Sequence, residues 1–100
     1  MDFLTKKEME TYEIFFAEIE DTENELINFL DEGNKVDKEK MEDFIYIQQN
    51  FILRLKNELE EIFQNYDNDE YTHVEWEYDD FEKSIENFWE DYEDLEKEEN

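Results

Sequence analysis

The 100-residue chain has no cysteine, no proline and a single glycine, Gly33. Without cysteine no disulfide can hold the fold together and no thiol chemistry is possible, which fits a reducing cytoplasm. Without proline, and with one glycine, the chain lacks the usual loop signals, and this favours long helices. A chain of this length corresponds to one domain, residues 1–100, which can bury about two-thirds of its unfolded surface.

Long apolar runs are missing as well. The first seven residues contain no apolar core of signal-peptide length. The most apolar stretch, residues 44–55, is interrupted by two glutamines, an asparagine and Arg54, so we expect no membrane span. We therefore predict a cytoplasmic protein.

Basic residues are scarce. Nine Lys and Arg stand against 34 Asp and Glu, which gives a formal net charge of −25. Such a charge repels itself in the compact state, and in a chain of low hydrophobicity it is typical of disorder. Here 17% of the residues are aromatic, which predicts a folded chain whose electric field has been selected for a purpose.

The kind of basic residue indicates a source. Lysine outnumbers arginine eight to one, and Ile, Phe, Asn and Tyr are abundant. These residues are typical of AT-rich codons, which points to a low-GC bacterium, or to a phage or mobile element that such a host carries. Adaptation to a salt-saturated cytoplasm is the less fitting explanation of the acidity.

Two long amphipathic helices are predicted over about residues 5–32 and 37–66. Thr5 and Glu8 form a capping-box pair at the first, and Gly33 stands where a helix C′ residue turns left-handed. Asp37 is a good N-cap for the second, and Val36 with Met41 has the spacing of a hydrophobic staple. The apolar stripe of the first is Met9, Tyr12, Phe16, Ile19, Leu26 and Leu30, interrupted by Glu23; that of the second is Met41, Phe44, Ile45, Phe51, Ile52, Leu55, Leu59, Ile62 and Phe63.

A shorter third helix is predicted over about residues 80–96, capped by Asp79 or Asp80. Its stripe is Phe81, Ile85, Phe88, Tyr92 and Leu95. Before it, residues 74–78 alternate apolar and acidic side chains, which suggests a short extended segment or an ordered loop at 72–78. The expected fold is all-α: a three-helix bundle made of a long antiparallel hairpin and a C-terminal helix.

The charge is concentrated after Tyr66. Residues 67–100 contain 16 acids and only Lys83 and Lys97. Helix neighbours three or four residues apart lie about 5–6 Å from each other at Cβ, while duplex DNA carries one charge per about 1.7 Å, or about 3.4 Å per strand. Carboxylates along a helix can therefore loosely imitate a file of phosphates, although an acidic helix face is also commonly no more than a solvated surface.

This region is the candidate partner-binding surface. Trp76 and Tyr78 are its candidate anchors, because aromatic rings are enriched at interface hot spots and a guanidinium can stack on them. Alternatively, Val74, Trp76 and Tyr78 close the core, and Trp89 has the same ambiguity. The candidate residues are Asp67, Asp69, Glu70, Glu75, Trp76, Glu77, Tyr78, Asp79, Asp80, Glu82, Glu86, Glu90, Asp91 and Asp94.

Residue patterns for catalysis, metals or cofactors are not found. His73 has no second His and no Cys to join it in a metal site or a triad. The Asp67-Asn68-Asp69 stretch resembles the start of a calcium loop but lacks the glycine and the final glutamate. We therefore expect no enzyme activity, no cofactor and no metal site.

In size, acidity and low-GC character the chain resembles the small phage-encoded inhibitors that imitate nucleic acid, including anti-CRISPR and anti-restriction proteins. These share no motif or fold, so the resemblance is one of type. It implies a basic protein surface as partner, on a CRISPR effector of the Cas9 type or a restriction nuclease, with no direct nucleic acid and no membrane. An immunity protein or antitoxin that neutralises a cationic nuclease toxin is the alternative, and an acidic structural or regulatory bundle is a third. The chain is expected to be a monomer or a homodimer, with Phe15, Ile27 and Phe29 as a spare apolar stripe.

Overall fold

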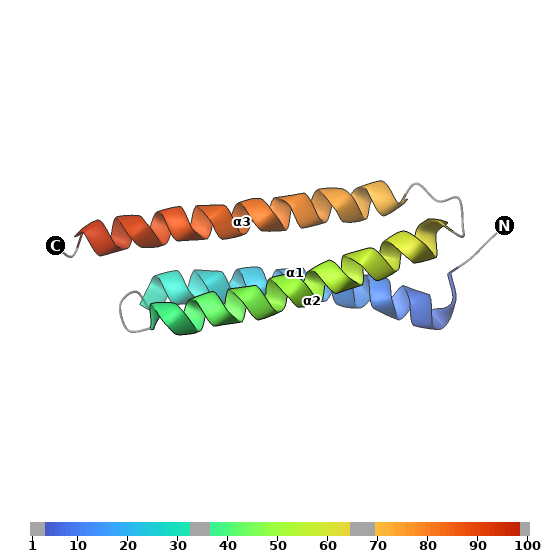
Figure 1. Ribbon diagram of the computed structural model, residues 1–100, viewed down its shortest axis with the longest axis horizontal. Helices are drawn as coiled ribbons and strands as arrows, with labels where there is room; N and C mark the ends of the chain where they lie inside the picture. Colours follow the sequence, from blue (N-terminus) through green and yellow to red (C-terminus); the bar gives the residue numbers. More distant parts are fainter. Residues whose placement is uncertain (1–3, 33–36, 65–69, 99–100) are drawn as a thin grey trace.

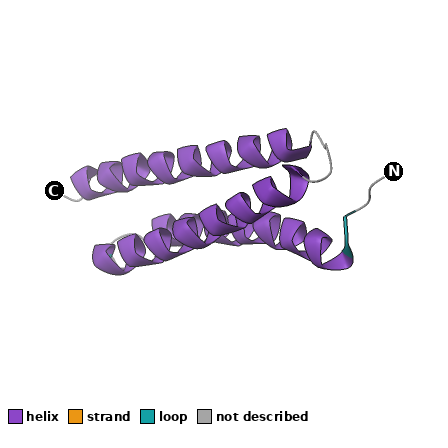
Figure 2. Cartoon of the chain, turned by 45° about the vertical axis from the view of Figure 1, so that its right-hand side comes forward, coloured by secondary structure: helices purple, strands orange, loops and turns teal. Residues whose placement is uncertain are grey.

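The protein is an all-α three-helix bundle in a computed structural model that describes residues 4–32, 37–64 and 70–98. The helices are α1 (Lys6–Glu32), α2 (Lys38–Gln64) and α3 (Glu70–Glu98), and each packs against both of the others. They form a rod with extents of 60 × 19 × 16 Å, in which α1 and α3 run in one direction and α2 in the other (Figure 1). The described residues contain no strand (Figure 2). The predicted fold class is confirmed.

Local signals fix where the first two helices begin. The Thr5 amide donates to Glu8 Oε1 at 2.8 Å, and the Glu8 amide donates back to Thr5 Oγ1 at 3.1 Å. This is the reciprocal pair of a capping box. At α2, Asp37 Oδ1 accepts the Glu39 amide at 3.0 Å, as an N-cap does. The predicted roles of Gly33 and Val36 lie outside the described residues.

The prediction for the third helix was wrong at its start. The helix begins at Glu70 and not near residue 80, so residues 72–78 are helical and not extended. Val74 and Tyr78 are spaced i, i+4 and continue the apolar stripe of Phe81. The five residues 74–78 therefore fit the helical period and the two-residue period of a strand equally well. Length decides between them: α1 and α2 have 27 residues each, about 40 Å of helix, and a helix of 17 residues would cover only about 25 Å of their apolar seam.

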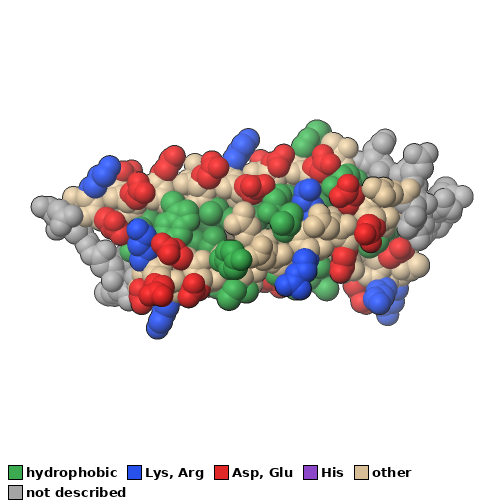
Figure 3. All heavy atoms as spheres, viewed as in Figure 1, with side chains coloured by type: hydrophobic (Ala, Val, Ile, Leu, Met, Phe, Trp, Pro, Cys, Tyr) green, Lys and Arg blue, Asp and Glu red, His purple; other side chains and the backbone are tan. Residues whose placement is uncertain are grey.

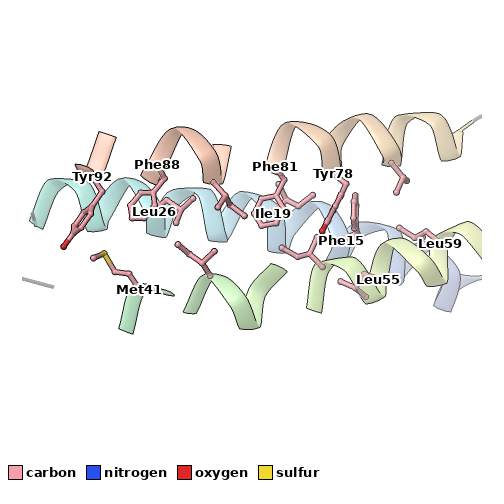
Figure 4. Packing of buried hydrophobic residues seen from close by; sticks show 14 of the residues in the cluster. Phe15, Ile19, Leu26, Met41, Leu55, Leu59, Tyr78, Phe81, Phe88 and Tyr92 are labelled. Atoms are coloured by element: carbon pink, nitrogen blue, oxygen red, sulfur yellow. The ribbon is translucent and has the colours of Figure 1, made fainter. Parts of the chain in front are cut away.

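The core runs the length of the rod between the three helices (Figure 4). Its buried side chains are Phe15, Ile19, Leu26, Met41, Ile45, Ile52, Leu55, Leu59, Phe63, Val74, Tyr78, Phe81, Ile85, Phe88 and Tyr92. Two residues of the predicted stripes, Met9 and Phe51, lie instead on the surface, 48% and 38% exposed.

The spare stripe predicted on α1 does not exist as an outer surface. Phe15 is fully buried in the core, and Phe29 packs edge-on against Phe44 of α2 at 5.6 Å between ring centroids. Ile27 alone of the three is exposed. The sequence of α1 did not determine the rotation of the helix about its axis to better than about one residue. In the bundle, α1 is rotated so that these residues do not form a dimer interface.

Buried polar groups on the α1–α2 seam satisfy one another. Thr22 is completely buried, and its hydroxyl donates to the Glu18 carbonyl at 2.7 Å. Gln48 of α2 donates from Nε2 to Thr22 Oγ1 at 3.0 Å and to Glu18 Oε2 at 3.1 Å. Among the described residues no buried side-chain polar atom lacks a partner, as expected of a native core.

Candidate partner-binding surface

The three helices carry very different charges. By sequence, α1 has ten acids and two lysines, and α3 has 13 acids and two lysines. In contrast, α2 has six acids and four basic residues. The formal charges are therefore −8, −2 and −11, so α1 and α3 together hold most of the charge of the whole chain. The structure extends the sequence-based expectation, which considered the C-terminal third alone.

Most predicted site residues lie at the surface of α3. Exposed are Glu75, Trp76, Asp79, Asp80, Glu82, Glu86, Glu90, Asp91 and Asp94, while Glu77 is half-buried. Asp67 and Asp69 lie outside the described residues, and Glu70 begins α3. Because exposed acids follow each other at steps of three and four from Glu75 to Asp94, they form files along the helix. We call the exposed acids of α3 the acidic face.

The two predicted aromatic anchors differ in their exposure to solvent. The Trp76 side chain is 64% exposed, among the acids of the acidic face. Val74 and Tyr78 are 0% and 6% exposed and belong to the core, as the alternative prediction had it, so the assignment of Tyr78 as a surface anchor was wrong. The cause is the helical period, which turns residues 76 and 78 about 200° apart. Trp89 is half-buried against Phe88 and Tyr92, with ring centroids 4.9 and 5.9 Å away.

Tyr78 and Tyr71 form instead a joint with Lys56 of α2. The Lys56 ammonium lies 5.6 Å from the Tyr78 ring centroid and 5.8 Å from that of Tyr71, and its Nζ donates to Tyr71 Oη at 3.5 Å. Burial raises the pKa of both phenols above the ordinary 10.0, although Lys56 acts in the opposite direction. The joint pins the first turns of α3 to α2.

Half of the eight exposed large apolar side chains among the described residues belong to α2, and only one belongs to α3. The α2 residues Tyr46, Ile47, Phe51 and Leu53 are exposed, and residues 44–57 contain no acid. Figure 3 shows apolar side chains visible between acidic ones along one face of the rod. The surface of α2 thus differs in chemistry from the acidic face of α3.

A pocket of about 220 Å³ lies between α1 and α3. Its apolar lining comes from Leu26, Ile27, Leu30 and Phe88, and its polar lining comes from Glu23, Ser84, Asn87 and Asp91. Ser84 Oγ donates to Glu23 Oε2 at 2.6 Å across the seam. This pocket was not predicted from the sequence. The position of Glu23 could have indicated it, because an acid that interrupts an apolar stripe needs polar partners in the folded protein.

The described residues contain no group of three or more His, Cys, Asp and Glu side chains that could hold a metal ion. The lone His73 stacks on Phe16 at 5.5 Å between ring centroids. No described helix is long and apolar enough to cross a membrane. Comparison with protein-family models, curated proteins and solved structures finds no match.

Proposed function

We propose that this protein is a DNA-mimicking inhibitor that occupies the basic nucleic-acid-binding cleft of a bacterial defence nuclease, with a CRISPR effector of the Cas9 type as the favoured target. The observation that carries the proposal is the unequal division of charge: −11 on α3 and −8 on α1, but −2 on α2. A charge needed only for solubility would have no reason to avoid one helix.

The density of charge supports the same function. The 13 carboxylates of α3 are distributed over 29 residues, about 44 Å of helix, or one for each 3.4 Å or so. One strand of duplex DNA has about the same axial spacing of phosphates, about 3.4 Å. A basic cleft gains affinity for DNA from released counterions, and a rod with this density of carboxylates can exploit the same gain.

The test is a competition for DNA. The purified protein is titrated into a guide-loaded Cas9-type effector, and into restriction nucleases from low-GC bacteria, with labelled target duplex. We expect loss of the shifted DNA complex, with an inhibition constant that weakens steeply as salt rises. An immunity protein predicts a different result, since its partner is a nuclease toxin and neither class of enzyme in this titration would be inhibited. Tight binding of a partner that excess duplex does not release would contradict DNA mimicry.

Matched charge reversals locate the surface. Glu75, Asp79 and Glu86 of α3 are changed together to Lys, and the control changes Glu42, Asp43 and Glu61 of α2 to Lys; all six side chains are exposed. In both variants three negative charges are replaced by three positive ones, so the net charge rises by the same six units. We expect inhibition to weaken at least about tenfold, or about 1.4 kcal/mol, for the α3 variant, and much less for the control. Equal losses would mean that only the net charge matters.

A further inference from the structure

The pocket between α1 and α3 has the chemistry of a binding site for a long cationic side chain. Its floor is apolar, because Leu26 is 4% and Phe88 is 2% exposed. Phe88 and Leu26 come together from different helices (Figure 4). Carboxylates stand on its lining from both sides, Glu23 from α1 and Asp91 from α3.

The Glu23 carboxylate is held in place. Ser84 donates to its Oε2 at 2.6 Å, and the same hydroxyl lies 3.0 Å from the Asp80 carbonyl one turn earlier in α3. A carboxylate has about four lone-pair positions, and the Ser84 bond uses one of them. Glu23 is therefore a partly buried, oriented acceptor with capacity for further donors.

The lining also has an order along the rod. Because α1 and α3 run in the same direction (Figure 1), Glu23 lies opposite Ser84 at one end, and Asp91 is seven residues further along α3. Seven residues correspond to about 10 Å of helix. The apolar floor therefore extends between an acidic end at Glu23 and a second acid at Asp91.

Charge and shape together select the occupant. An anion would be repelled, and a neutral apolar group would cover the carboxylates without offering them a donor, which is costly. The methylene stem of arginine or lysine lies readily along apolar surface while its head stays polar. Arginine is the better match of the two, since its planar guanidinium can donate two parallel hydrogen bonds to one carboxylate.

We propose that this pocket binds an arginine side chain of the basic partner, with the stem on Leu26 and Phe88 and the guanidinium on Glu23. The inference rests on the proposed function for the identity of the partner, since a DNA-binding cleft offers arginines. It goes further in assigning α1 to the interface: the partner bridges α1 and α3, and the seam between them is the anchoring position.

The experiment titrates N-acetyl-arginine N-methylamide into the ¹⁵N-labelled protein at physiological salt and follows the amide resonances. We expect saturable shifts concentrated at Glu23, Ile27 and Asn87. The citrulline analogue has nearly the same shape without the charge, and the norleucine analogue keeps only the stem. Both are expected to bind at least about tenfold more weakly.

Matched variants separate the pocket from the general field of the protein. Glu23→Gln keeps the size of the side chain and removes its charge, and Glu13→Gln makes the same change at an exposed position of α1 ten residues away. We expect about tenfold weaker arginine binding for Glu23→Gln and little change for Glu13→Gln. Ser84→Ala, which releases Glu23, is expected to weaken binding about threefold. Circular dichroism checks that each variant is folded.

Each outcome decides the point. The pocket assignment would be overturned if Glu23→Gln and Glu13→Gln had equal effects, or if the citrulline analogue bound equally well. It would also be overturned if the shifts were spread evenly over the acids, or if no localised shifts were seen up to the solubility limit of the probe. Failure of the proposed function looks different: arginine would still bind at Glu23, but the protein would not compete with DNA. Conversely, DNA competition that survives Glu23→Gln unchanged would leave the function standing without this anchor.

Discussion

Helices α2 and α3 contribute equally to the core but face the solvent with opposite chemistry. Both present an apolar stripe of similar period, from Met41 to Phe63 and from Val74 to Tyr92. On its outer side α2 exposes apolar residues and has a formal charge of −2, whereas α3 exposes files of acids and has −11. Folding thus depends on what the helices share, and the acidity belongs to the faces that packing does not use.

The largest effect is expected from equivalent changes in the shared core. Ile52 of α2 is fully buried and Ile85 of α3 is 8% exposed. We expect Ile52→Ala and Ile85→Ala each to lower the free energy of unfolding by about 2–5 kcal/mol, because each removes buried methyl groups and leaves a cavity. Urea unfolding measures both. If Ile85→Ala costs only a few tenths of a kcal/mol, α3 adds acidic surface to a hairpin that is stable without it. That result would contradict an equal contribution of α2 and α3 to the core.

A smaller effect is expected where each helix donates a hydrogen bond to a glutamate of α1. Gln48 of α2 donates to Glu18, and Ser84 of α3 donates to Glu23. We expect Gln48→Leu to cost about 1–3 kcal/mol, because it also leaves the buried Thr22 without its donor. Ser84→Ala should cost less, about 1 kcal/mol, since the lining of the pocket is open to solvent. Thermal or urea unfolding measures both variants. A larger loss of stability for Ser84→Ala than for Gln48→Leu would mean that α3 is linked to α1 more tightly than α2 is.

Burial of Tyr71 and Tyr78 between α2 and α3 predicts a loss of stability at high pH. Burial raises the pKa of Tyr71 and of Tyr78 in the folded protein above 10.0. As pH passes this ordinary value the unfolded chain releases these protons first, so it binds fewer protons than the folded state and the stability falls. The contribution is complete below pH 10 and is lost as pH rises through the raised values. With phenylalanine at both positions, the free energy of unfolding should depend less steeply on pH in this range. If the slope of that pH dependence is unchanged, other groups cause the loss of stability.

The smallest effect is expected from removal of a single surface charge. Glu90 of α3 has acids at positions 86, 93 and 94, all on neighbouring turns, whereas Glu58 of α2 has Arg54 on one side and Glu61 on the other. Since like-charge helix pairs cost about 0.2–0.5 kcal/mol each, Glu90→Gln should stabilise the protein by about 0.5–1 kcal/mol at low salt. Glu58→Gln should change little. If melting temperatures rise equally for both, or if added salt fails to reduce the gain, local repulsion on α3 is not the cause.

The candidate site was only partly accessible to sequence reasoning. The exposed acids from Glu75 to Asp94, except Glu93, and the exposed Trp76 could be listed because acids rarely enter a core and the third helix had a clear stripe. Tyr78 was misplaced because alternation over residues 74–78 gave it the same face as Trp76. The pocket could not be foreseen, since Glu23 and Ser84 are 61 residues apart in the chain and meet only when α1 and α3 pack in parallel.

The sequence by itself determined that this chain makes helices, where the first two begin and how many charges it carries. These properties depend on neighbours within one or two turns: the capping pair of Thr5 and Glu8, the N-cap of Asp37 and the three-four spacing of apolar residues. The tertiary structure decided that α3 extends back to Glu70, that Phe15 and Tyr78 are core while Trp76 is surface, and that acids of α1 and α3 share a seam. Those decisions concern the length of seam to be covered and the rotation of each helix, which only contacts between distant segments can fix.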